Sequence, residues 1–150
     1  QESRFVMDAR SGVGASGLMQ IMPATAKWTA KKIGMDYSPD LLTDRDANIR
    51  LGTSYLKLVL DDFAGSQAMA AAAYNAGPGR IQKLRKEAEK RGLNPNVWFN
   101  NVELIAAQRI GEETVTYVAN IYKYYYAYTL LEEQRAAKEN ARSELLQSIH

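Results

Sequence analysis

The chain has 150 residues, a hydrophobic fraction of 46%, a charged fraction of 24% and a formal net charge of +2. A chain of this length buries roughly two thirds of its unfolded surface, which supports one domain without metal or disulfide cross-links. No apolar run approaches the ~20 residues that span a bilayer. The lack of cysteine excludes thiolate metal sites, one histidine cannot hold a metal cluster, and so small a charge does not indicate nucleic-acid binding.

Both ends of the chain are unusual. The first residue is Gln1 rather than methionine, and neither a basic stretch with an apolar run nor a cleavage site follows it. We therefore expect a fragment of a longer protein. The single histidine, His150, is the last residue, and we assign it no role.

The first half of the chain is predicted to be helical. Residues 1–7 have the composition of the last turns of a helix, and the small residues within 8–16 indicate a loop. A helix over 23–33 begins with proline and ends at glycine. Asp44 or Asp46 caps the next helix, whose apolar residues fall on one face until Gly65: Ile49, Leu51, Tyr55, Leu58 and Val59.

The second half continues the helical pattern. An alanine-rich helix over 67–74 allows close approach of its neighbours and is broken by a tight turn at 75–79. A charged helix over 79–91, a helix over about 98–110 and a last helix from about residue 112 follow. We divide the chain into a domain over 1–131 and a polar helical tail over 132–150, which projects into solvent or pairs outside the domain.

Glu2 is the first candidate for chemistry. A carboxyl group becomes a general acid near neutral pH when burial against apolar surface raises its pKa, and Phe5 and Val6 follow Glu2 closely. The position alone also fits an exposed glutamate that pairs with Arg4. The other acidic residues of this half, Asp36, Asp40, Asp44 and Asp46, lie in a connecting segment where they suit turns and caps.

Two further segments offer amide and backbone hydrogen-bonding groups. The first, residues 11–20, joins a glycine-bearing loop to Gln20, and the second is Tyr74-Asn75 at the end of the alanine-rich helix. Such groups suit the hydroxyl and N-acetyl groups of a sugar. Taken singly, each segment also fits ordinary loop, cap and core structure.

Five separated strings together resemble a known family. They are Glu2-Ser3-Arg4-Phe5, Ser11-x-x-Gly14-Ala15-x-Gly17-Leu18-Met19-Gln20-Ile21-Met22-Pro23, Asn48-Ile49-x-Leu51-Gly52, Ala73-Tyr74-Asn75-Ala76-Gly77 and Glu113-Thr114-x-x-Tyr117-Val118. In this order they resemble the motifs of lytic transglycosylases of the soluble Slt type, glycoside hydrolase family 23. The strings at 96–103 and 117–125 resemble the membrane-bound lytic transglycosylase F branch in particular.

The resemblance implies a mostly α, lysozyme-like fold of the goose-type and Slt catalytic domains, with a substrate groove. It implies cleavage of the MurNAc–GlcNAc β-1,4 bond of peptidoglycan without a cofactor or metal, leaving a 1,6-anhydromuramoyl end. Glu2 matches the single catalytic acid and base of the family. Because the muramoyl C6 hydroxyl attacks within the same sugar, no second carboxylate is needed.

The resemblance also implies the substrate-binding residues. Ser11, Gln20 and Met22 match groove positions near the acid, Tyr74 and Asn75 match the opposite wall, and Glu113 and Tyr117 match the late motif. Met22 fits core packing equally well, and Glu113 also suits a helix N-terminus. An aromatic cluster follows on the last helix, and its density favours packing against the core and against neighbouring side chains over sugar stacking: Tyr122, Tyr124, Tyr125, Tyr126 and Tyr128.

Two other functions remain open at the level of sequence. A goose-type lysozyme-like hydrolase would use water in place of the C6 hydroxyl, and a catalytically silent module would only bind peptidoglycan. In each case the expected partner is the peptidoglycan glycan strand, in the periplasm or cell envelope. An upstream regulatory domain or an outer-membrane lipid anchor would belong to a segment outside this sequence, and the oligomeric state stays open.

In the family, an apolar helical run precedes the catalytic glutamate and buries it. That run is absent here, since Glu2 is the second residue. If the protein began at Gln1, Glu2 would lie on a frayed helix end, and we would expect low activity.

Overall fold

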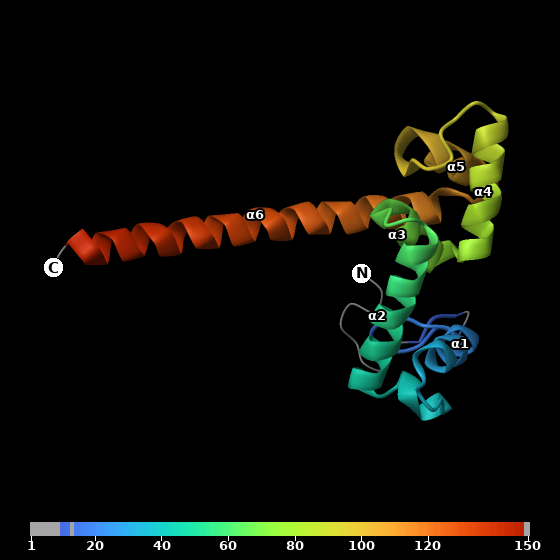
Figure 1. Ribbon diagram of the computed structural model, residues 1–150, viewed down its shortest axis with the longest axis horizontal. Coiled ribbons are helices and arrows are strands. Elements are labelled where there is room, and N and C mark those ends of the chain that lie inside the picture. Colours follow the sequence, from blue (N-terminus) through green and yellow to red (C-terminus); the bar gives the residue numbers. More distant parts are fainter. Residues whose placement is uncertain (1–9, 13, 149–150) are drawn as a thin grey trace.

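The computed structural model describes residues 10–12 and 14–148, with side chains to residue 146. Within these residues the chain forms six α-helices and two short helical segments, and it contains isolated β-bridges but no strand. Figure 1 shows a body of short helices from which the last helix projects. The predicted mostly α class is confirmed.

The first helices form a small layer with its own core. They are α1 (Pro23–Ile33), the 3-10 turn η1 (Pro39–Leu42) and α2 (Arg45–Asp62). Asp44 caps α2, because its Oδ1 atom accepts a hydrogen bond from the Ala47 amide at 2.8 Å. The side chains that pack between these elements are Ile21, Ala26, Ala30, Leu42 and Leu51. The bounds of α1 and the cap of α2 agree with the sequence prediction.

The helix α3 (Gln67–Ala76) lies at the centre, where it contacts α2, α4 (Pro78–Lys90) and α6 (Glu112–Ser148). The alanines at 68 and 70–73 are buried, so these neighbours approach closely. The helix is two residues longer than predicted, and the predicted turn over 75–79 is confined to Gly77. Pro78 needs no N–H as the first residue of α4, and Gly77 makes the break with φ 92°.

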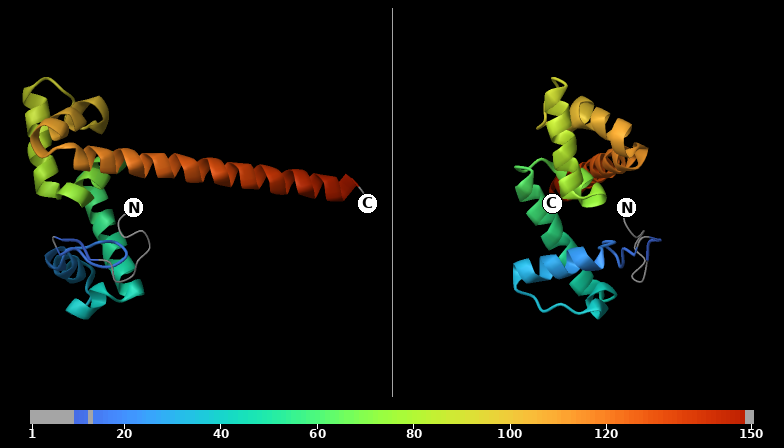
Figure 2. Two further views of the ribbon diagram at one scale, coloured as in Figure 1. Left: turned by 180° about the vertical axis from the view of Figure 1, so that it is seen from behind. Right: turned by 90° about the vertical axis from the view of Figure 1, so that its right-hand side faces the viewer.

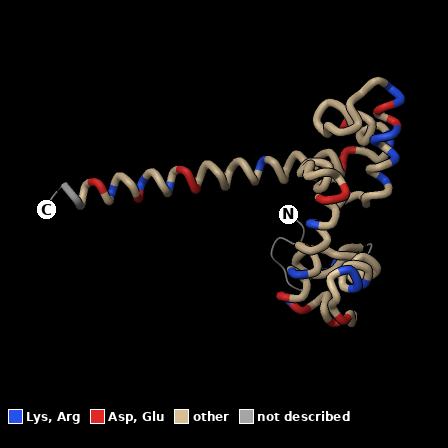
Figure 3. Tube along the Cα trace, in the orientation of Figure 1, with Lys and Arg blue, Asp and Glu red and all other residues tan. Residues whose placement is uncertain are grey.

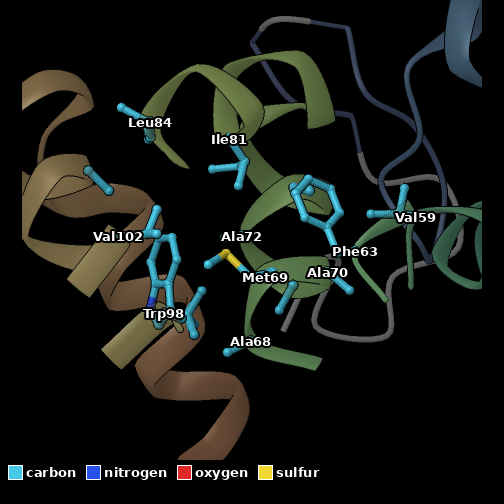
Figure 4. Packing of buried hydrophobic residues seen from close by; sticks show 14 of the residues in the cluster. Val59, Phe63, Ala68, Met69, Ala70, Ala72, Ile81, Leu84, Trp98 and Val102 are labelled. Atoms are coloured by element: carbon cyan, nitrogen blue, oxygen red, sulfur yellow. The ribbon is translucent and has the colours of Figure 1, made fainter. Parts of the chain in front are cut away.

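The main core lies between α3, α4 and the segment that follows α4. Figure 4 shows Met69 of α3 at its centre, with Trp98 and Val102 on one side and Phe63 on the other. All four side chains are buried. The right-hand view of Figure 2 shows that the part of the body around this main core lies above the α1–α2 layer.

The helix predicted over about 98–110 is interrupted, and that prediction is wrong for its first turn. The structure has a kinked segment η2 (Trp98–Val102) before α5 (Glu103–Ile110). Phe99 is extended with ψ 130°, and Asn100 is left-handed with φ 58°. Asparagine tolerates this conformation better than most residues, and the Asn100 amide donates to Glu103 Oε2 at 3.0 Å.

The last helix, α6 (Glu112–Ser148), has 37 residues. Thr114 and Val118 are buried in the body, whereas every side chain over 130–146 is exposed. Figure 3 shows basic residues along α4 and both signs of charge spread along α6. Among the described residues, no helix combines the length and the apolar content of a membrane span.

The predicted packing of the aromatic cluster on α6 is confirmed in part: Tyr122, Tyr125 and Tyr126 make ring contacts with their neighbours. The prediction is wrong for Tyr124 and Tyr128, which make no ring contact among the described residues. Tyr122 is partly buried against the core, but the other four are exposed: Tyr124, Tyr125, Tyr126 and Tyr128. The reason is that α6 projects from the body (Figures 1 and 2), and no described element covers its later turns.

Candidate substrate groove

A pocket of about 470 Å³ lies between the loop before α1 and the junction of α3, α4 and α6. Its lining residues are Ser11, Ala15, Gln20, Ile21, Met22, Thr25, Tyr55, Tyr74, Asn75, Ala76, Gly77 and Glu113. Six of the seven substrate-binding residues predicted from the sequence are among them. The seventh, Tyr117, lies one turn after Glu113 on α6 and is not in the lining, and Glu2 lies outside the described residues.

The loop that carries Gln20 is held in place by Asn48 of α2. The buried Asn48 side chain donates to the carbonyl oxygens of Ser16 at 3.1 Å and Leu42 at 2.9 Å. Its Oδ1 atom accepts from the Met19 amide at 2.8 Å. One amide group therefore joins the groove loop, η1 and α2, with its hydrogen-bonding atoms satisfied by backbone.

Two glycines allow this close approach. A Cβ atom at Gly17 would lie 2.2 Å from Asn48 Nδ2, and the residue has φ 77°, which side-chain-bearing residues rarely adopt. A Cβ atom at Gly52 would lie 2.5 Å from the Met19 Cβ atom. Gly17 of the loop thus faces α2, and Gly52 of α2 faces the loop, so both glycines have a packing role.

Tyr74 of α3 holds the same loop from the other side. Its Oη atom donates to the Met19 carbonyl oxygen at 2.8 Å. The Tyr74 ring also contacts Tyr55, with ring centroids 5.3 Å apart, and Tyr55 meets Trp28 edge-on at 6.3 Å. Tyr55 and Tyr74 therefore give the pocket an aromatic wall, and Trp28 of α1 extends the row of rings beyond the lining.

Asn75 is oriented by the first turn of α6. Thr114 is buried, and its Oγ1 atom donates to Asn75 Oδ1 at 2.8 Å. This bond fixes which end of the amide faces Thr114. The Asn75 Nδ2 group, at the other end of the amide, is its hydrogen-bond donor.

The described part of the pocket lining is polar and aromatic and carries little charge. Among the lining residues that the structure describes, Glu113 is the one charged residue. Burial raises the pKa of the Tyr55 phenol, and the Asp62 carboxylate raises it further, so Tyr55 stays neutral at physiological pH. Among the described residues, no group of three or more His, Cys, Asp or Glu side chains could hold a metal ion. This lining suits an uncharged ligand rich in hydroxyl and amide groups.

Three residues of the site had no role in the sequence prediction. Thr25 and Tyr55 line the pocket, and Asn48 supports it from behind. The sequence placed Tyr55 on the apolar face of its helix, and the ring does pack partly against the core. Asn48 belonged to a motif of the resemblance, and its position at the start of a helix gave no sign of its partners in a distant loop.

The chain belongs to the transglycosylase SLT domain family, whose family model matches residues 1–97. It is 39% identical over 132 residues to the soluble lytic murein transglycosylase of Escherichia coli, covering 85% of this chain and 19% of that protein. It is 32% identical over 159 residues to the membrane-bound lytic murein transglycosylase F of Shewanella woodyi, covering 93% and 31%. The chain thus spans less than a third of either relative.

Solved structures give the same result. The structure of an inactive Glu-to-Gln mutant of lytic transglycosylase Slt from Pseudomonas aeruginosa matches with a TM-score of 0.63 and 42% identity, covering 78% of this chain and 18% of that one. The 70 kDa soluble lytic transglycosylase of Escherichia coli matches with a TM-score of 0.61 and 35% identity, covering 86% and 20%. The resemblance seen in the sequence and the fold that it implies are confirmed.

Proposed function

We propose that this chain is the catalytic domain of a peptidoglycan lytic transglycosylase. The observation that carries the proposal is the pocket, in which residues from three separated motifs meet: Ser11 and Gln20, Tyr74 and Asn75, and Glu113. The relatives are named lytic murein transglycosylases, which supports the same reaction class for this chain.

In this proposal the enzyme cleaves the MurNAc–GlcNAc β-1,4 bond with Glu2 as acid and base. The Glu2 carboxyl gives its proton to the glycosidic oxygen as the bond to the muramoyl C1 breaks. The carboxylate then accepts the proton of the muramoyl C6 hydroxyl while that oxygen bonds to C1. The products are a new GlcNAc hydroxyl and a 1,6-anhydromuramoyl end, and Glu2 regains its proton without consuming water.

The other groove residues would bind and orient the glycan. Gln20 and Asn75 offer side-chain amides to hydroxyl and N-acetyl groups from opposite walls, while Tyr74 and Met22 offer apolar contact. Met22 is 42% exposed, which supports groove lining over core packing. Ser11 and Glu113 add oxygen atoms that can accept hydrogen bonds from sugar hydroxyls. Tyr117 is proposed to act next to Glu113.

The substrate would place the protein in the cell envelope. Peptidoglycan glycan strands are the proposed partner, and a periplasmic location follows from that substrate. An anchor to the outer membrane through another segment remains part of the proposal, because some relatives are named as membrane-bound.

Replacing Glu2 tests the proposal. We expect the Glu2→Gln variant, made in the full chain, to lose at least about 10³-fold in cleavage of purified peptidoglycan, because the acid and base steps are lost together. Mass spectrometry of the wild-type products should show 1,6-anhydromuramoyl ends. The Glu112→Gln variant is a matched control, because Glu112 is exposed at the start of α6 and outside the pocket lining.

The outcomes separate the alternatives. Products with reducing ends alone would indicate a hydrolase in which water replaces the C6 hydroxyl. If wild-type protein binds peptidoglycan but releases no fragments, it is a silent binding module. Cleavage by the Glu2→Gln variant at the wild-type rate would show that another residue is the acid.

A further inference from the structure

The turns of α6 just outside the body carry a group of exposed aromatic residues. Between Tyr117 and Leu131 the sequence has one charged residue, Lys123, and four exposed tyrosines at 124–126 and 128. Exposed apolar surface of this density on a projecting helix usually marks a binding site. The proposed groove chemistry does not use these tyrosines.

These aromatic residues divide between two faces of the helix. Among the described residues, ring contacts link Phe99 to Tyr122 at 5.1 Å, Tyr122 to Tyr126 at 6.4 Å and Tyr126 to Tyr125 at 5.8 Å. No ring contact within the described part of the chain involves Tyr124 or Tyr128, whose side chains are 49% and 64% exposed.

Tyr124 and Tyr128 share the face of α6 that meets the groove. Each residue of an α-helix turns by about 100°, so residues 117, 124 and 128 lie within about 20° of a common line along the axis. That line is about 40° from Glu113, which lines the pocket. Tyr126 lies about 140° from Glu113, on the far side of the helix.

The spacing places these rings beyond the groove rather than in it. With a rise of 1.5 Å per residue, Tyr124 and Tyr128 lie about 10 Å and about 16 Å beyond Tyr117 along the axis. Figure 1 shows α6 as a straight rod over this distance. A linear polymer bound in the pocket has to leave it, and one that leaves past Glu113 would meet these two rings in turn.

We propose that Tyr124 and Tyr128 form an aromatic subsite that extends the groove and binds sugar units of the glycan strand away from the cleaved bond. The inference rests on the proposed function. A tyrosine ring offers an apolar face to the C–H groups of a sugar and a hydroxyl to its oxygens, and the scarcity of charge on this face suits sugar rings. This face of α6 continues from Glu113 in the pocket lining, and we therefore expect a glycan rather than a second copy of α6 to bind the two rings.

The test is a comparison of two substrates on the full-length enzyme. The measured quantity is the kcat/KM on long glycan strands divided by the kcat/KM on a short oligosaccharide. We expect the Tyr124→Ala/Tyr128→Ala double variant to lower this ratio by roughly fivefold to tenfold, because its KM on the long strands is higher. The Tyr124→Phe/Tyr128→Phe variant keeps the rings and should keep most of the ratio. Tyr126→Ala is the matched control, because Tyr126 is equally exposed at 60% on the other face.

Each result decides the inference. A fall in the ratio confined to the alanine double variant supports the subsite. The subsite is overturned by an unchanged ratio or by an equal fall of the ratio in Tyr126→Ala. It is also overturned if light scattering shows a change from dimer to monomer while the ratio stays the same. A wild-type enzyme that cleaves neither substrate refutes the proposed function itself, so the two failures are distinguishable.

Discussion

Asn48 shows how a residue outside the pocket determines the shape of the groove. Its side chain is 1% exposed, yet it binds backbone atoms of Ser16, Met19 and Leu42. The sequence marked Asn48 as part of a motif and could not reveal this role, because two of the partners lie about thirty residues away and no periodicity encodes such a contact. Most of the residues that line the pocket were predictable, because they lie in the motifs that the sequence shares with the family.

Replacing Asn48 should destabilise the whole domain. In Asn48→Ala, two buried carbonyl oxygens and one amide lose their partner, and we expect the free energy of unfolding to fall by about 2 to 4 kcal/mol. Urea unfolding monitored by circular dichroism measures this change. Asn140→Ala on the exposed part of α6 is the control and should stay within about 0.5 kcal/mol of wild type. Equal stability of the two variants would contradict the role of Asn48.

At the scale of elements, helix ends with local signals were predictable. Pro23, Asp44 and Ser66 mark three helix starts through the first-turn and cap chemistry seen in the structure. The segment from Trp98 to Val102 was not predictable in this way, since its residues are all compatible with a helix. The kink there depends on Asn100 and on burial of Trp98 in the core, which is a tertiary effect.

Helices α4 and α5 are joined by a charged contact that should respond to pH. Arg109 donates to both carboxylate oxygens of Glu87, and Arg91 also contacts Glu87. The hydrogen bond from Arg109 lowers the pKa of Glu87 below its ordinary value of 4.5, although burial opposes the shift. A carboxyl with a lowered folded pKa stabilises the fold above its ordinary pKa, and this contribution is lost as the pH falls through the folded pKa.

We therefore expect the Glu87→Gln variant to lose less stability than wild type between pH 7 and pH 3, because it has no such contribution to lose. The melting temperature as a function of pH measures the effect. Glu89→Gln, on an exposed position of the same helix, should keep the wild-type pH profile. A wild-type profile for Glu87→Gln as well would show that the contact with Arg109 contributes nothing in solution.

At the scale of the whole molecule, the projecting part of α6 has little contact with the body. The sequence predicted a polar helical tail after Leu131. It could not show that the tail continues α6 without a break, or that the tyrosines before it are exposed. Whether a helical tyrosine packs or stays exposed depends on the position of the rest of the fold, which the composition of one helix does not determine.

The domain and tail division can be tested by shortening the chain. Removing residues 132–150 should change the melting temperature by less than about 2 °C, because the described side chains of this segment are exposed. Differential scanning calorimetry gives the melting temperature. A cut after Asn120 is the contrast, because it removes Tyr122 from the core and should lower the melting temperature strongly. A similar loss from the shorter truncation would show that the tail is part of the folded domain.

The two hydrogen bonds at Met19 have a consequence for motion. The Met19 amide is held by α2 through Asn48, and its carbonyl is held by α3 through Tyr74. The loop cannot move away from one helix while it keeps its bond to the other without distorting the peptide between them. The groove wall should therefore open in a single cooperative step that breaks both bonds, so that amide hydrogen exchange of the loop follows the opening of the α2–α3 pair rather than local fraying.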